Sequence, residues 1–185
     1  MKELRAWLPW VAIAVAVAAI VHLATLYAVP GFVMSRAFAI MGAPNAMHHG
    51  KRVDEHSHAV VRPSPDLLYS ACPFDLSAGP LRVRSPVVPH TYWSVSGFDD
   101  ATNNFFAMND NGVQGVVDFL IVQQGTKPNT EGFKTIISPT RKGIILFRTL
   151  INGEKNFALF DALRRQATCA TFHALPSDVS SGAGK

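Results

Sequence analysis

The residues with the most obvious chemistry are four histidines and two carboxylates within an eleven-residue segment. They are His48, His49, Asp54, Glu55, His56 and His58. Imidazole groups suit both zinc and copper, so the four histidines form a candidate metal site. The spacing matches no structural zinc pattern, and no predicted helix or strand holds the ligands in place, which weakens binding. A solvated polar segment is therefore the competing interpretation, and no cofactor is predicted.

Signatures of hydrolases and nucleotide-binding enzymes are missing from the sequence. It contains no G-x-S-x-G, H-E-x-x-H, P-loop or Rossmann pattern. Between residues 62 and 170 there is one histidine, His90, so a Ser-His-Asp arrangement cannot be argued. Asp99 and Asp100 are neighbours at a predicted strand end and point to opposite faces, which makes them a poor acid–base pair.

A proline-rich stretch, RPSPDLLYSACPFDLSAGPLRVRSP, carries further candidates. Pro63 and Pro65 predict a stiff, extended entry. Asp66 is a candidate cap of a short turn formed by LLYS. Tyr69 is expected to bury its ring and to keep its hydroxyl on a partner. The stretch is thus either a functional loop or a plain connection between strands.

The chain carries no charged residue between Arg5 and Arg36. Within this gap lies an apolar run of about 20 residues, which is the length that a membrane-spanning helix needs. Trp7, Trp10 and Tyr27 lie near its ends, where an interfacial aromatic belt is expected. A cleaved signal peptide is the alternative, but its apolar core is usually shorter. We therefore expect an uncleaved anchor.

Lys2 and Arg5 precede the apolar run and only Arg36 follows it closely. This asymmetry favours a single-pass protein of the bacterial inner membrane with its C-terminal domain in the periplasm. An oxidising compartment permits a disulfide between Cys72 and Cys169, and two unpaired thiols are the alternative. The net charge of +4 includes no basic stripe, so no nucleic-acid partner is predicted.

The sequence divides into four zones. They are an anchor at 1–35, a juxtamembrane linker at 36–61, a folded domain at 62–170 and a disordered tail at 171–185. About six strands are predicted, at 81–85, 91–98, 103–109, 116–123, 133–138 and 143–151. A helix capped by Asn152 follows, with Phe157, Phe160, Leu163 and Ala167 on its apolar stripe. The predicted fold class is α+β, with a mainly antiparallel sheet and one C-terminal helix.

The proline-rich stretch, together with YWSVSGFDDATNNFF, SPTRKGIILFRTL and RRQATC, resembles the uncharacterised bacterial family called domain of unknown function 1254. The resemblance covers about 60–169. Members frequently carry a second module, domain of unknown function 1214, for which this chain has no room. The resemblance implies a short, membrane-anchored form whose companion is a separate chain. Matched positions that would line a shared ligand or partner surface are Arg62, Asp66, Tyr69, Trp93, Asp99 and Asn104.

Three functions are compatible with these features. The first is a non-catalytic, anchored extracytoplasmic subunit or binding module of an envelope complex, with sheet edges and exposed aromatics such as Trp93 and Phe106 as its contact surface. The second is a small-ligand-binding or hydrolytic enzyme that uses Asp66, Tyr69 and Asp99. The third is metal handling through the linker histidines.

Overall fold

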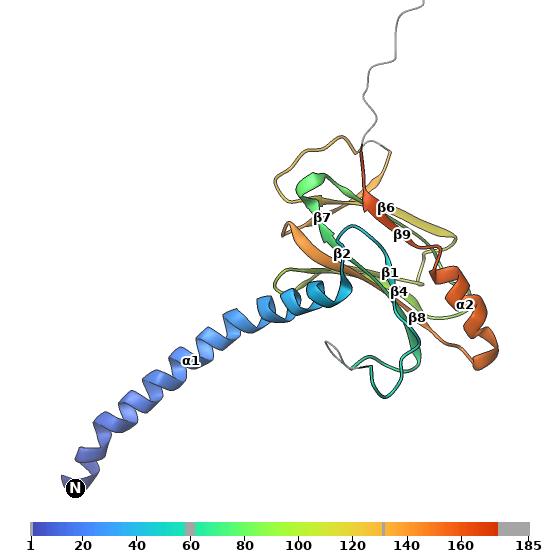
Figure 1. Ribbon diagram of the computed structural model, residues 1–185. Helices are drawn as coiled ribbons and strands as arrows, with labels where there is room; N and C mark the ends of the chain where they lie inside the picture. Colours follow the sequence, from blue (N-terminus) through green and yellow to red (C-terminus); the bar gives the residue numbers. More distant parts are fainter. Residues whose placement is uncertain (1, 58–61, 131, 174–185) are drawn as a thin grey trace, which may run out of the picture.

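The computed structural model describes residues 2–57, 62–130 and 132–173, and the chain forms one long helix followed by a two-sheet domain (Figure 1). Residues 174–185 of the expected tail and His58 lie outside the described residues. The helices are α1 (Lys2–Met41) and α2 (Phe157–Arg164). The strands are β1 (His48–His49), β2 (Leu67–Asp75), β3 (Leu81–Pro86), β4 (Trp93–Asp99), β5 (Asn104–Asn109), β6 (Val116–Gln123), β7 (Lys134–Ser138), β8 (Lys142–Leu150) and β9 (Thr168–Thr171).

The strands form two sheets that pack face to face. Sheet A has the order β1-β2-β8-β4-β5, and sheet B has the order β7-β6-β3-β9. Every pairing is antiparallel except that of β6 with β7. The α+β class with a mainly antiparallel β region is therefore confirmed, whereas the described residues contain nine strands instead of about six.

The core lies between the sheets and uses alternate residues of each strand, because successive side chains of a strand point to opposite faces. Trp93 is only 1% exposed and lies 6.0 Å from the Phe147 ring. Phe106 is half-buried, with its ring 5.6 Å from Phe119. The expectation that Trp93 and Phe106 form an exposed contact surface is therefore wrong. Both side chains face inward, where burial of aromatic area stabilises the fold.

Strand β2 is the main element that the sequence analysis missed, because its flanking prolines are typical of a loop. Pro73 is tolerated because β1 pairs only with Ser70 and Ala71, which leaves the outer edge of β2 open at the proline. The Pro73 carbonyl accepts a hydrogen bond from the Asn45 amide at 2.8 Å. The predicted LLYS turn is wrong, since these residues begin β2, and Asp66 is an exposed residue in front of the strand.

A disulfide joins the two sheets. Cys72 of β2 and Cys169 of β9 are paired with a Cα–Cα distance of 6.4 Å across 97 residues of sequence. Both cysteines are buried in the core.

Strand β9 follows helix α2, which ends at Arg164, so Ala167 lies beyond the helix on which it was expected. The N-cap position is occupied by Asn156, and Asn152 instead donates to the His90 carbonyl at 3.3 Å.

Helix α1 extends away from the domain and contacts it only near its C-terminal end (Figure 1). It is long and apolar enough to cross a membrane. The helix continues to Met41, so the first residues of the expected linker are helical. Met34 and Ala37 are buried there against Ala71 and Ile144 on the outer face of sheet A.

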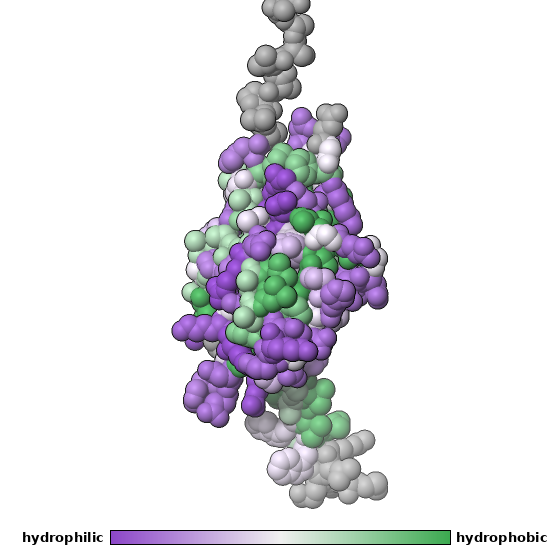
Figure 2. Space-filling model, turned by 90° about the vertical axis from the view of Figure 1, so that its right-hand side faces the viewer, coloured by the Kyte–Doolittle hydropathy of each residue, from purple (hydrophilic) through white to green (hydrophobic). Residues whose placement is uncertain are grey.

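The opposite side of the domain carries α2. Seen from that side, the surface is mainly hydrophilic, with small apolar areas between the polar side chains (Figure 2). The buried residues of α2 are Phe160, which joins the core, and Arg164. Helix α2 therefore contributes both an apolar contact and a buried charge to the domain.

Candidate functional site

A cavity of about 660 Å³ lies between the C-terminal part of α1 and the outer face of sheet A. Its wall is predominantly apolar. The apolar side chains come from α1 on one side and from β2, β4 and β8 on the other, and they include Val29, Val33, Met34, Phe98, Ile144 and Leu146. A mostly apolar hollow of this size with a few polar groups is typical of a ligand-binding site.

The polar groups in this cavity come mainly from two arginines and a tyrosine. Tyr69 of β2 and Arg148 of β8 are direct cross-strand partners, and Arg62 lies in the segment before β2. The Tyr69 hydroxyl accepts a hydrogen bond from the Ser64 amide at 3.0 Å, in agreement with the predicted role of a half-buried ring with a bonded hydroxyl. Among the described residues that line the cavity there is no Asp or Glu. The site is therefore positively charged.

The Arg148 guanidinium is only partly hydrogen-bonded. Its Nη2 atom donates to Ser96 Oγ at 3.3 Å, whereas its Nε atom is buried and has no hydrogen-bond partner among the residues that the structure describes. Ser94 Oγ, on the residue opposite Arg148 in β4, is likewise buried without a partner. Such groups are rare in folded proteins and destabilise the fold unless a ligand or water satisfies them. The outer face of sheet A therefore offers unused polar atoms beside the cavity.

The six matched positions named from the sequence do not form one site. Arg62 and Tyr69 line the cavity. Asp66 and Asn104 are exposed, and Trp93 belongs to the core.

Asp99 has a structural role. Its side chain is 5% exposed, and its carboxylate accepts hydrogen bonds from the amides of Ala101 and Asn103 at 2.9 and 2.8 Å and from Asn103 Nδ2 at 3.0 Å. These bonds close the turn between β4 and β5, where Thr102 has a positive φ of 68°. The hydrogen bonds of the Asp99 carboxylate therefore hold this turn in place.

The feature that sequence reasoning missed is a buried arginine on α2. Arg164 is 4% exposed, and its guanidinium donates to the carbonyls of Tyr69 and Gly50, both at 2.7 Å, and to Asp161. It also donates to Ser70 Oγ at 3.2 Å. Because Arg164 occupies an inward position of a short amphipathic helix, only its spacing relative to Phe160 could have indicated its burial. It cross-links α2, β2 and the segment after β1.

A serine and a histidine meet beside Arg164, but they do not form a catalytic triad with Asp161. The His49 Nδ1 atom lies 2.9 Å from Ser70 Oγ, and Ser70 is 1% exposed. Both carboxylate oxygens of Asp161 accept hydrogen bonds from arginines, Arg164 and Arg165. Burial raises the pKa of Asp161, but these hydrogen bonds and charges outweigh it and hold the pKa below its usual value. The cluster is a structural cross-link.

The linker histidines are separated in the structure. His48 Nε2 contacts the Ala43 carbonyl at 2.9 Å, His49 contacts Ser70, and His56 is exposed beside Glu55. Within 2–57, 62–130 and 132–173, no three His, Cys, Asp or Glu side chains come close enough to hold a metal ion. His58, the fourth candidate ligand, lies outside these residues.

His49 makes stability depend on pH. Burial, followed by the charges of Arg164 and Arg165, lowers the pKa of His49 from its ordinary 6.5. Below about pH 6.5 the unfolded chain therefore binds a proton that the folded chain does not, and stability falls as the pH falls, by at most about 1.4 kcal/mol per pH unit. We expect His49→Asn to reduce this slope below about pH 6.5 in urea denaturation. His56→Asn, at an exposed position, is the control, and an unchanged slope in His49→Asn would contradict the assignment.

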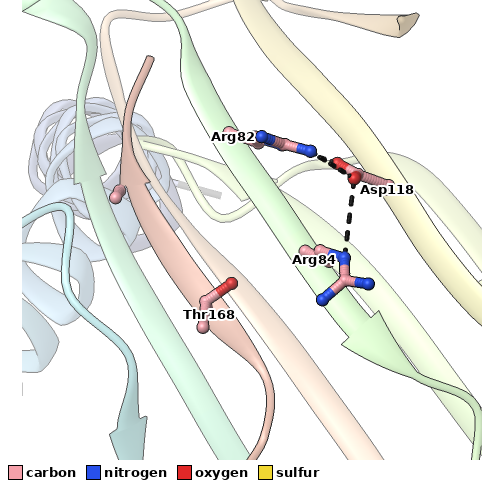
Figure 3. Close-up of a pocket in the computed structure, with 5 residues that line it drawn as sticks. Arg82, Arg84, Asp118 and Thr168 are labelled. Carbon is pink, nitrogen blue, oxygen red and sulfur yellow. Dashed lines mark hydrogen bonds and ion pairs between the residues drawn. The ribbon is translucent and has the colours of Figure 1, made fainter.

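A second hollow lies on the outer face of sheet B, where Arg82, Arg84 and Asp118 meet beside Thr168 (Figure 3). Arg82 donates to both oxygens of Asp118, at 2.9 and 2.6 Å, and Arg84 lies 3.7 Å from the same carboxylate. The hydrogen bond from Arg82 lowers the pKa of Asp118. These charged groups satisfy one another on an open strand surface, which is typical of a structural ion pair.

The fold is shared with a solved structure. The VPA0106 protein from Vibrio parahaemolyticus is similar over 87% of this chain, with a TM-score of 0.62 and 13% identity. A putative uncharacterized protein from Burkholderia cenocepacia matches 82% of this chain, with a TM-score of 0.47 and 11% identity. The chain spans 40% and 42% of the lengths of these two proteins. No curated protein matches the chain.

The family assignment rests on the β domain and the segment that leads into it. The model for "Protein of unknown function (DUF1254)" matches residues 44–171, which include all nine described strands and α2. This match begins three residues after the end of α1, so the long apolar helix lies outside it. The chain belongs to the DUF1254 family.

Proposed function

We propose that the protein is a membrane-anchored, non-catalytic binding module of a bacterial envelope complex, with its β domain on the periplasmic side of the inner membrane. The observation that carries this proposal is the continuity of α1. One uninterrupted helix contains the apolar segment at its N-terminal end and the docked residues Met34 and Ala37 at its C-terminal end. If the apolar segment spans the bilayer, the cavity is held at the membrane surface.

The disulfide supports a location outside the cytoplasm. Bonds of this kind persist in oxidising compartments such as the periplasm and are rare in the cytosol. The excess of basic residues before the apolar segment, Lys2 and Arg5 against Arg36, favours the same orientation.

The chemistry of the cavity supports binding. Its polar groups are mainly two guanidiniums, which donate hydrogen bonds and carry fixed positive charge, and a phenol that already has a partner. Asp99, the most buried of the carboxylates considered for acid–base chemistry, holds a turn. The arrangement is suited to retaining an anionic ligand rather than to moving protons.

The edge of sheet B offers a surface for a partner chain. Strand β7 is an edge strand, and its Ile137 is 63% exposed. Edge strands present unpaired backbone groups that another chain can pair with, and an exposed isoleucine beside them adds apolar area. We propose this edge as the partner surface in place of the buried Trp93.

In-cell cross-linking of the full-length protein, followed by detergent extraction and mass spectrometry, tests the proposal. One reproducible envelope protein is expected to remain attached. Ile137→Lys is expected to reduce its recovery about tenfold, the effect of losing roughly 1.4 kcal/mol. Leu159→Lys on α2, where the leucine is 56% exposed, is the matched control. Recovery of the protein without a partner would contradict the proposed complex. Equal recovery of the partner with Ile137→Lys and Leu159→Lys would contradict the assignment of the β7 edge as the partner surface.

A further inference from the structure

We propose that the cavity between α1 and sheet A binds one anionic phospholipid from the membrane in which α1 is anchored. An acyl chain lies against the apolar wall, and the phosphate contacts Arg62 and Arg148. This inference rests on the proposed membrane anchoring, and it adds a ligand and a site to it.

The position of the cavity along α1 matches the level of lipid headgroups. Trp7 and Trp10 are separated from Tyr27 by 17–20 residues, which is about 26–30 Å of helix and close to the thickness of the hydrocarbon core. Tyr27 is 85% exposed on the helix, as expected for a residue at the interface. Val29, the first cavity residue, lies two residues further on, roughly 3 Å beyond Tyr27. The cavity therefore begins where phosphate groups are found.

The charge of the cavity selects an anion. In the part of the chain that the structure describes, neither Arg62 nor Arg148 forms an ion pair with a carboxylate. This distinguishes them from Arg82 and Arg84, which share Asp118. A phosphate oxygen that contacts the Arg62 and Arg148 guanidiniums would form charge-assisted hydrogen bonds, which are stronger than those between neutral groups.

The apolar wall suits an acyl chain that reaches the cavity from the bilayer. Val29, Val33 and Met34 belong to the same helix that forms the anchor, and Ile144 and Leu146 of β8 face them across the cavity. A lipid next to α1 can enter along the helix, so its chain has to cross only the headgroup layer. We therefore assign the site to a membrane phospholipid rather than to a diffusible fatty acid, and the same experiment tests both ligands.

Native mass spectrometry of the full chain in mild detergent tests this assignment by titration with phosphatidylglycerol. One lipid adduct is expected to saturate at a lower lipid concentration than the weaker adducts that form by non-specific binding. The double substitution Arg62→Gln and Arg148→Gln is expected to weaken this adduct at least about tenfold, because it removes two charged contacts. Arg62→Gln alone, at an exposed position, and Val33→Trp, which fills the cavity, are expected to weaken it as well. Arg84→Gln is the control and keeps full binding.

Each other outcome overturns the inference. Equal adducts in wild type and in all cavity variants would place the lipid elsewhere. An adduct formed with decanoate or inorganic phosphate but not with phosphatidylglycerol would identify a diffusible ligand and exclude the phospholipid. The intact mass in the same spectra separates failure of the anchor from failure of the site. A chain shortened at its N-terminus contradicts the anchored function, whereas a full-length chain without an adduct contradicts the lipid site alone.

Discussion

Replacing Arg164 with methionine is expected to lower the free energy of unfolding by about 3–5 kcal/mol, the usual effect of removing one partner from a buried ionic cluster. Methionine keeps much of the apolar stem but makes none of the four hydrogen bonds to Tyr69, Gly50, Ser70 and Asp161. The Gly50 carbonyl then loses its bond from the guanidinium, and the contact between α2 and β2 loses its charged link. Urea denaturation of the full chain in detergent, followed by circular dichroism, measures the change.

The neighbouring arginine provides a matched control. Arg165 also pairs with Asp161, at 2.8 Å, but its side chain is 51% exposed. Arg165→Met is expected to lower the free energy of unfolding by only about 0.3–0.5 kcal/mol, the usual value for an exposed ion pair one turn apart on a helix. Similar effects at Arg164 and Arg165 would show that the buried cluster does not stabilise the domain.

Loss of the disulfide is the second large effect. The double substitution Cys72→Ala and Cys169→Ala is expected to lower the free energy of unfolding by about 2–5 kcal/mol, because the bond closes a loop of nearly 100 residues and restricts the unfolded chain. The 97-residue separation places the entropic contribution near the upper end of this range. Urea denaturation with and without a reductant measures it.

The reductant separates the disulfide from the packing of the cysteines. Wild type treated with reductant is expected to approach the stability of the double variant, and the double variant itself is expected to show no response. Since Cys72 is 0% and Cys169 6% exposed, reduction requires the domain to open, so full unfolding in the presence of reductant precedes the measurement. A loss below about 1 kcal/mol would contradict a stabilising link between the sheets.

The six longest alternating or β-branched segments could be read from the sequence because their patterns are strong. The run Val116–Gln123 was predicted at its observed bounds, and the other five differ by at most two residues at either end. Strand β2 was not predicted because its prolines are typical of loops. Its place in sheet A depends on pairing with β8, which the local sequence does not specify. Strands β1 and β9 have two and four residues, too few to show a period.

The candidate site was predictable only in part. Tyr69 and Arg62 were named from the proline-rich stretch, and both line the cavity. Arg148 was not named as a site residue, because it is one polar residue in the alternating pattern of β8, and this pattern predicts a solvent-facing side chain. Its position in the cavity depends on the C-terminal end of α1 packing against sheet A, a tertiary contact between residues more than 100 positions apart. Trp93 is the opposite case, a residue predicted for the contact surface that lies in the core. Its aromatic side chain is typical of interfaces, but the side chain points inward from β4 and is buried.

The most direct test of membrane anchoring outside the cytoplasm is the intact mass of the protein extracted from bacterial membranes, after thiol alkylation without reductant. The proposed function predicts a full-length chain of 20.1 kDa in the membrane fraction, with neither Cys72 nor Cys169 alkylated. A soluble chain that lacks the apolar segment would show that the segment is a cleaved signal. A full-length chain with two alkylated cysteines would place the domain in a reducing compartment and contradict the periplasmic location.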